Sequence, residues 1–414
     1  MNIGPILRAM KHNRTRVTLL VLEIAMTLAI VTNCVNVILA ERAKMAVPSG
    51  FDDDNILWVH ALPFTPEFQE DALINTTIVA DLRRLSAIPN VKAVANSHFR
   101  LWEGGGSSTS IKPVGTKQVP IGTQIYWSTS GIFDALGIRI TEGRNFAESD
   151  HGTGPENDTP RVVIISRTVA NALFPDGKAV GKSIVEALED GAPLGEPLQI
   201  VGVFERFFNP YGQNPDSWRG VADRAMFVPT RVGGYGYGFR YLIRCEPGTM
   251  TAVQAAVEKA LVGVNPNRVI EFEPTPEKKA RWFSANRMAV LVMTGVIIVL
   301  VFVTALGILG ITALSVSERT KQIGTRRALG ATRSDILRHF LVENWMTTTA
   351  GLAIGVIGAY ALNYLLVANL TDVKMPWQLV VTGMVVLWAS GLLAALPPAL
   401  RATRVPPSIA TRSV

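Results

Sequence analysis

Cysteine and histidine are scarce in this chain of 414 residues. Its two cysteines, Cys34 and Cys245, lie in parts of the sequence that differ in character, so we expect no disulfide between them. Its five histidines are scattered and show none of the spacings typical of a metal site. The scarcity argues against a disulfide-held fold, and we predict no metal or cofactor bound by the chain itself.

Charge is missing from four long stretches. Residues 17–40 contain a single charged residue, Glu23. Residues 288–317, 344–371 and 375–400 contain none. Each stretch exceeds the roughly 20 residues that cross about 30 Å of hydrocarbon as a helix. Because only a helix satisfies its own backbone hydrogen bonds in lipid, we predict four transmembrane helices. The first is too long for the apolar part of a signal peptide, about 7–15 residues, so we expect an uncleaved anchor.

Positive charge is concentrated in three segments. These are residues 1–16, residues 318–338 with six bases against two acids, and residues 401–414. Because Lys and Arg are retained on the cytoplasmic side, we predict that these segments are cytoplasmic and that residues 48–274 form a domain on the other side. The net charge of +7 follows from this topology, so nucleic acid is not expected as a partner.

The large domain shows the same pattern at both of its ends. A strand, an amphipathic helix and a second strand are predicted at 55–62, 76–86 and 91–99, and again at 239–245, 252–262 and 268–273. We expect these two βαβ halves, within 51–103 and 239–274, to pack as one α+β subdomain. Residues 104–238 form a β-rich insert between them.

A strong helix start precedes the second span. Thr275, Pro276 and Glu277 supply an N-cap hydroxyl, a proline in the first turn and an acid at the positive end of the helix dipole. We therefore predict one helix over 275–317, about 64 Å long. The first span, 17–40, is predicted to extend to about residue 47, so the two helices would join the membrane to the domain as a stalk.

The segment 318–333 has its own helix signals. A short helix over 321–329 is expected to end at Gly330, and Thr332 to cap the next helix with Asp335 as its capping partner. That helix, 334–370, is amphipathic before it spans the membrane; a short outer loop 371–375, the last span 376–400 and the tail 401–414 follow. Composition alone leaves two interpretations open: a rigid contact for a cytoplasmic partner, or a basic loop that snorkels to lipid headgroups.

Two glycine-rich segments fall short of nucleotide-binding motifs. Residues 177–183 are one residue short of a phosphate-binding loop, and residues 233–238 lack the strand and helix of a dinucleotide fingerprint. Both are expected to be turns or loops. We find no Walker A motif in these residues, so no enzymatic activity is predicted for them.

Several motifs together resemble those of FtsX/MacB-type ABC transporter permeases. Residues 318–331 (ERTKQIGTRRALGA), followed by Asp335-Ile-Leu and Glu343, are similar to the cytoplasmic motif of that family. Residues 133–146, 163–184 and 200–203 resemble recurring motifs of the MacB-like outer domain, and residues 398–409 resemble the usual C-terminal ending. The resemblance covers nearly the whole chain.

The resemblance implies a fold and a location. The fold is an α-helical membrane protein with four transmembrane helices plus an α+β extracytoplasmic domain on a helical stalk, in which a split βαβ Porter-like subdomain carries a β-rich Sabre-like insert. The location is the bacterial inner membrane, with cytoplasmic termini and a periplasmic domain.

The resemblance also implies partners and a role. The expected partners are two copies of a separate cytoplasmic ABC ATPase, which bind ATP and Mg²⁺, a second permease copy or paralogue, and the lipid bilayer. A periplasmic adaptor and an outer-membrane channel are further candidates. The implied role is mechanotransmission, in which ATP-driven motion reaches the outer domain for export or efflux; lipoprotein release and regulation of a periplasmic hydrolase or signalling partner remain alternatives.

The same resemblance implies which residues face the ATPase. They are Glu318, Arg319, Gln322, Ile323, Gly324, Arg326, Arg327, Ala328, Leu329, Gly330 and Ala331. The family commonly has an acid where this chain has Gln322, so an ion pair to the ATPase is not available there. We therefore place more weight on Gly324, Arg326, Arg327, Leu329 and Gly330.

Glu23 is a separate candidate, as a polar site within the membrane. It lies about 9 Å inside the first span. An acid at such a position is a functional candidate by default. We expect it to snorkel or to pair with a nearby arginine.

Overall fold

The computed structural model describes residues 14–103, 107–151, 161–188, 190–208, 223–233, 236–369 and 374–406. The chain divides into a membrane unit, Met1–Ala46 with Ala285–Val414, and an α+β unit, Val47–Ser284. Most of the predicted N-terminal segment 1–16, most of the outer loop 371–375 and the end of the tail, 407–414, lie outside the described residues.

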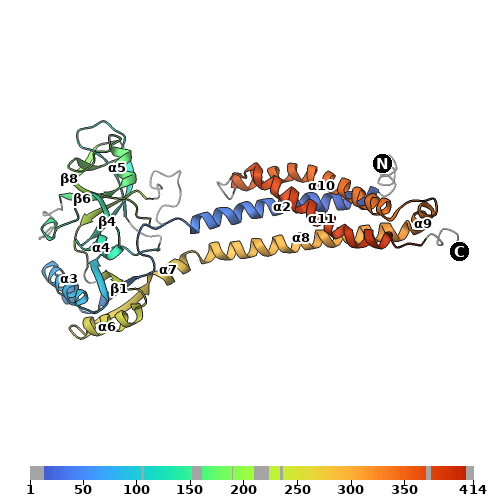
Figure 1. Cartoon of the computed structure of the whole chain (residues 1–414). Helices are drawn as coiled ribbons and strands as arrows, with labels where there is room; N and C mark the ends of the chain where they lie inside the picture. Colours follow the sequence, from blue (N-terminus) through green and yellow to red (C-terminus); the bar gives the residue numbers. More distant parts are fainter. Residues whose placement is uncertain are drawn as a thin grey trace. The chain divides into compact units, whose positions relative to one another are not determined.

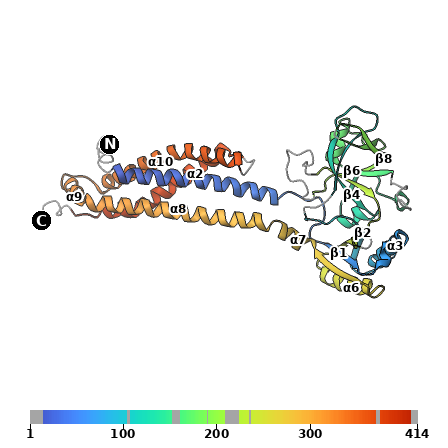
Figure 2. The same cartoon turned by 180° about the vertical axis from the view of Figure 1, so that it is seen from behind.

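Four helices in the described part of the chain are long and apolar enough to cross a membrane: α2 (Arg14–Met45), α8 (Ser284–Glu318), α10 (Arg333–Asn369) and α11 (Trp377–Ala402). They confirm the predicted four-span fold class. A short helix, α9 (Thr320–Ala328), lies between α8 and α10. Figures 1 and 2 show α2 and α10 side by side, and α8 running along α2.

The helix α2 is the most buried of the four and α8 the least. Leu20, Ile24 and Leu28 of α2 form one cluster with Ile308 of α8, Leu352 of α10 and Leu387 of α11. Glycines allow the helices to approach closely, as small residues commonly do between membrane helices. A Cβ atom added at Gly351 of α10 would lie 2.8 Å from the Ile24 Cβ, closer than real Cβ contacts.

Replacing Gly351 by leucine is therefore expected to destabilise the membrane unit by about 1–3 kcal/mol, because the added side chain must push α10 away from α2. The measurement is the thermal stability of the detergent-purified protein. Gly310→Leu is the matched control, since a Cβ atom at Gly310 on α8 would meet nothing within 4 Å. Equal stability of the two variants would contradict the close packing of α2 on α10.

The first sheet of the α+β unit has the strand order β11-β1-β10-β2. Its strands are β1 (Ile56–Pro63), β2 (Val91–Asn96), β10 (Phe239–Cys245) and β11 (Arg268–Pro274), and α3 (Asp71–Ser86) and α6 (Met250–Val262) supply its helices. All three neighbouring pairs are antiparallel. The two sequence-distant βαβ segments therefore interleave in one sheet, as expected, and share one hydrophobic core with both helices.

The second sheet has the order β5-β8-β6-β9-β4-β3-β7, and β7 also pairs with β8, so the sheet closes on itself. Its strands are β3 (Ser107–Pro113), β4 (Ile121–Ser128), β5 (Ile140–Gly143), β6 (Val162–Ser166), β7 (Ser183–Ala187), β8 (Pro193–Phe204) and β9 (Ala225–Pro229). Short helices α4 (Ile132–Leu136) and α5 (Arg167–Leu173) and 3₁₀ turns η1 (Pro66–Gln69) and η2 (Glu148–Asp150) complete the unit. The β-rich insert is thus a sheet of its own.

The predicted continuous helix over 275–317 is wrong in one respect, because it is interrupted. Helix α7 (Thr275–Trp282) ends at Trp282. The backbone of the next residue, Phe283 (φ −87°, ψ 11°), leaves the helical range, and α8 begins at Ser284. Phe283 is buried, with its ring centroid 5.4 Å from that of Trp102. This packing joins residues far apart in the sequence, so the local helix signals of 275–317 could not show it.

Candidate functional site

The helix α9 has a well-defined C-terminal end. Gly330 has a φ of +95°, in the left-handed region that favours glycine. The N–H of Ala331 donates to the Arg326 carbonyl (3.0 Å) and the N–H of Gly330 to the Arg327 carbonyl (3.2 Å). These two bonds form a Schellman motif, which ends the helix and satisfies its last carbonyls. The expectation that Gly330 ends this helix is confirmed.

The next helix begins with the expected capping box. The N–H of Asp335 donates to Thr332 Oγ1 (3.1 Å), and the N–H of Thr332 donates to Asp335 Oδ2 (3.0 Å). These reciprocal bonds satisfy free N–H groups at the start of α10. Only two residues, Gly330 and Ala331, therefore separate the cap of α9 from that of α10, which holds the turn between the helices in one conformation.

One face of α9 is anchored to the membrane unit. Ile323 is buried in a cluster with Val316 of α8, Ile336 and Phe340 of α10, and Ala399 and Ala402 of α11. Arg327 Nη1 donates to the carbonyls of Thr403 (3.2 Å) and Val405 (2.6 Å), just after α11. Hydrophobic burial and a charge-assisted bond to the end of another helix thus fix the orientation of α9.

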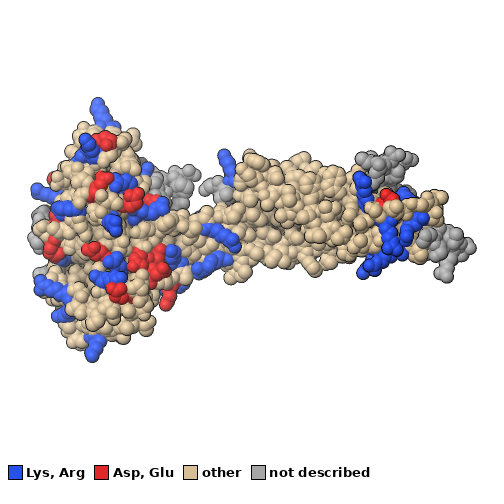
Figure 3. All heavy atoms as spheres, in the orientation of Figure 1, with Lys and Arg blue, Asp and Glu red and all other residues tan. Residues whose placement is uncertain are grey.

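The opposite face of α9 is exposed. Lys321, Gln322, Thr325 and Arg326 are exposed, and so is Leu329, which keeps 83% of its accessible surface. Figure 3 shows Lys and Arg gathered at this end of the membrane unit, with a charge-free band along the middle of the same face. A basic surface with one prominent leucine is suited to contact another protein.

Two ion pairs join the junction of α8 and α9 to neighbouring helices. Arg16 Nη1 donates to both carboxylate oxygens of Glu318 (2.9 and 2.8 Å), which links α2 to α8. Arg319 Nη1 donates to Glu343 Oε2 (2.9 Å), which links the start of α9 to α10, and both side chains are mostly buried (15% and 17% exposed). The second pair is screened less by solvent than the first.

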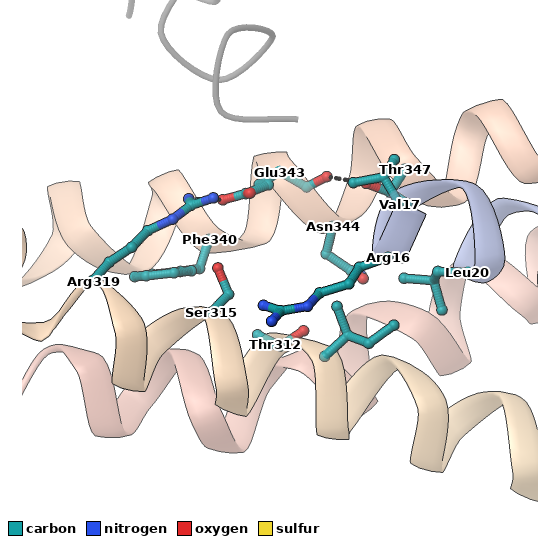
Figure 4. A pocket seen from close by; sticks show the side chains of 11 residues that line it. Arg16, Val17, Leu20, Thr312, Ser315, Arg319, Phe340, Glu343, Asn344 and Thr347 are labelled. Atoms are coloured by element: carbon teal, nitrogen blue, oxygen red, sulfur yellow. Dashed lines mark hydrogen bonds and ion pairs between the residues drawn. The ribbon is translucent and has the colours of Figure 1, made fainter. Parts of the chain in front are cut away.

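A cavity of about 60 Å³ lies between these two ion pairs. Figure 4 shows Arg16 and Arg319 reaching along it from two helices, with Phe340 between them. Thr312, Ser315 and Asn344 add polar groups to its wall. The cavity has room for one or two water molecules, so it is a polar gap between helices and not a substrate site.

Comparison with protein families assigns both halves of the chain. A model of the FtsX-like permease C-terminal domain matches residues 294–407, and a model of the MacB-like periplasmic core domain matches residues 20–260. The chain belongs to the MacB/FtsX family of ABC transporter permeases. The family resemblance seen in the sequence is thereby confirmed.

Individual relatives agree with the family assignment. The uncharacterized ABC transporter permease YvrN of Bacillus subtilis is 30% identical over 70% of this permease and 70% of its own length. Two proteins named macrolide export ATP-binding/permease protein MacB, from Azoarcus sp. and Hahella chejuensis, are each 26% identical over 98% and 96% of this permease. This permease spans 58% of the length of each of these two MacB proteins and corresponds to their permease portion.

The structure divides the predicted ATPase-facing residues of this permease into two groups. Gln322, Arg326, Ala328, Leu329 and Gly330 are exposed at the site. The others have partners within the membrane unit. Three of them are bonded to other helices or their ends: Glu318 to Arg16, Arg319 to Glu343, and Arg327 to the residues just after α11. Ile323 and Gly324 are buried, and Ala331 packs against the hydrophobic cluster that contains Ile323. The predicted set omitted Lys321 and Thr325, which also lie on the exposed face of α9. Their separation of four residues, one helical turn, and their position beside Gln322 and Arg326 could have indicated this.

Glu23 does not pair with an arginine among the described residues of this permease. Its carboxylate lies against α8, where a Cβ atom added at Gly307 would be 2.6 Å from Oε2. One turn further along, the hydroxyls of Thr27 and Thr304 are hydrogen-bonded (2.7 Å). Glu23 therefore belongs to a polar strip between α2 and α8, and the glycine makes room for its carboxylate.

Proposed function

We propose that this permease transmits ATP-driven motion from a separate cytoplasmic ATPase to its α+β unit, and that the motion serves the export of a periplasmic or membrane substrate. The proposal rests on the difference between the two faces of α9, one of which is packed and the other exposed. Its inner face is fixed to α8, α10 and α11, and its outer face presents Leu329 among basic and polar side chains. A force applied to the outer face therefore reaches three membrane helices at once.

The proposed topology follows from charge. The end of the membrane unit that carries α9 is rich in Lys and Arg, which favours the cytoplasmic side. We accordingly propose the bacterial inner membrane, with both termini cytoplasmic and the α+β unit in the periplasm. Because the ATPase must be cytoplasmic to meet ATP and Mg²⁺, this topology puts α9 on the same side as its proposed partner.

The proposed assembly contains two permease chains and two ATPase subunits. The helix α8 offers a surface for the second permease chain, because it exposes large apolar side chains along its length, among them Leu291, Ile298 and Phe302. Such a face is stable against lipid or against a second permease chain. We favour export over lipoprotein release and over regulation because two relatives that cover nearly all of this chain are named macrolide export proteins.

The experiment is reconstitution of the permease with the ATPase encoded beside its gene. Lys44, exposed near the end of α2, is replaced by cysteine, and disulfide formation between two permease chains is measured with and without ATP. The ATPase carries a substitution that blocks hydrolysis. We expect a stable complex and more cross-linking with ATP, since bound ATP draws the ATPase subunits together. The unmodified permease is the control, because its Cys34 and Cys245 are buried. Absence of a complex, or cross-linking that ignores ATP, would refute the proposal.

A further inference from the structure

A second cavity lies within the α+β unit, where the two sheets meet. Its volume is about 400 Å³, within the range of small-molecule sites. An isolated bridge between Ser97 and Ser128 joins the sheets beside it. The wall includes His98, Trp127, Val232, Tyr237 and Arg240, which come from strands of both sheets and from the segments that follow them.

The wall of this cavity is held firmly in place. The side chain of Asn96 donates to the carbonyls of Val232 and Arg240 (2.9 Å each) and accepts from the N–H of Val232 (2.9 Å). On the other side, Gly238 has a φ of +66°, and a Cβ atom there would lie 2.3 Å from His60 Nε2. Gly238 thus lies in the cavity wall at a position that only glycine allows.

One part of the wall is aromatic. The rings of His98 and Trp127 meet edge to face with centroids 4.6 Å apart. His98 Nδ1 lies within hydrogen-bonding distance of both the N–H (3.1 Å) and the carbonyl (3.3 Å) of Trp127, which fixes the orientation of the ring. Burial lowers the pKa of His98 to about 4, so the ring is neutral at physiological pH. Tyr237, whose side chain is largely exposed, adds a third ring.

The other part of the wall is the guanidinium group of Arg240. Arg240 Nη1 donates to the His98 carbonyl (2.5 Å), and Arg240 forms no ion pair with any residue in the described ranges. Its Nε and His98 Nε2 are both buried without a hydrogen-bond partner in the same part of the structure. Burial and the neighbouring charge of Arg100 lower the pKa of Arg240, although the nearby charge of Glu103 opposes them. A buried guanidinium N–H without a partner is rare in native proteins, and an acceptor atom of a bound ligand would satisfy it.

We propose that this cavity binds a small aromatic carboxylate, with the carboxylate on Arg240 and the ring against Trp127 and His98. A carboxylate matches the guanidinium in charge and geometry, and a flat ring matches the aromatic wall. Binding needs neither ATP nor the ATPase. The inference therefore stands or falls separately from the coupling function proposed above.

The test uses the full-length protein in detergent, with indole-3-acetate as the probe and equilibrium dialysis as the measurement. We expect saturable binding of one molecule per chain. The neutral indole-3-acetamide is expected to bind about tenfold more weakly, because it lacks the charge that pairs with Arg240. No saturable binding of indole-3-acetate or benzoate up to about 10 mM would overturn the proposal. Equal binding of acid and amide would overturn the assignment of a carboxylate.

Two variants locate the site. Arg240→Gln is expected to weaken indole-3-acetate binding about tenfold. Val232→Trp keeps every charge and fills the cavity, so it should abolish binding even if the first variant is poorly folded. Arg83→Gln, on the exposed face of α3, is the matched control and should bind as the unmodified protein does. Unchanged binding in both cavity variants would place the probe elsewhere and refute the site.

Discussion

Replacing Leu329 by glutamate is expected to weaken the binding of the ATPase subunit by roughly thirtyfold or more, which corresponds to about 2 kcal/mol. Leu329, the residue directly after α9, keeps 83% of its surface accessible, so the isolated chain has little packing to lose there. In the proposed complex the leucine would be buried, and a glutamate would bring an unpaired charge into that contact. The measurement is the affinity of the purified permease for the ATPase, with ATP hydrolysis by the complex as a second readout.

The matched control makes the same change at another exposed leucine. Leu194 lies in β8 of the α+β unit and is 52% exposed. Leu194→Glu should leave ATPase affinity unchanged, and both variants should melt at the temperature of the unmodified protein. If Leu329→Glu binds the ATPase as tightly as Leu194→Glu does, the outer face of α9 is not the contact.

The second large effect is expected at Asp81. This carboxylate is fully buried and pairs with Arg268, whose side chain is also almost fully buried. Tyr241 donates to Asp81 Oδ2 (2.8 Å), and Arg268 Nη2 also donates to the Leu261 carbonyl (3.0 Å). The network ties α3 to β10, β11 and the end of α6. Asp81→Ala is expected to cost about 3–5 kcal/mol, because it leaves a buried guanidinium unpaired.

Hydrogen exchange of the β10 and β11 amides in the full-length protein measures this cost locally. The comparison variant replaces the whole network with apolar groups: Asp81→Leu, Tyr241→Phe and Arg268→Met together. It should be clearly more stable than Asp81→Ala, since no charged group is left buried alone. If instead the triple variant exchanges faster than Asp81→Ala, the unpaired charge is not the source of the loss.

Local patterns were enough to predict much of the fold. The four spans are long uncharged runs, and the two βαβ segments show strand and helix periodicity within windows of about ten residues. The helix ends within residues 318–335 were predicted for the same reason. Gly330 and the Thr332–Asp335 box act through bonds between residues close in sequence. The break at Phe283 was missed because the packing of Phe283 on Trp102 joins residues far apart in the sequence, which local helix signals do not report.

The candidate site was predicted only in part. The sequence placed the predicted ATPase-facing residues between the second and third spans. It did not show which of the two faces of α9 each residue occupies. Whether Arg327 points outward or binds the end of α11 depends on where α11 ends in space. The pairing of Arg16 with Glu318, 302 residues apart, likewise depends on how α2 lies against α8.

The sequence by itself determined the class of this protein: four membrane spans, a split α+β domain, basic segments on one side and a capped helix between the second and third spans. These features follow from composition and from interactions over a few residues. The tertiary structure alone decided which side chains of α9 remain free and how close Glu23 lies to α8. It alone brought His98, Trp127 and Arg240 around one cavity. Such juxtapositions arise when helices and sheets pack, and packing depends on every contact in the unit at once.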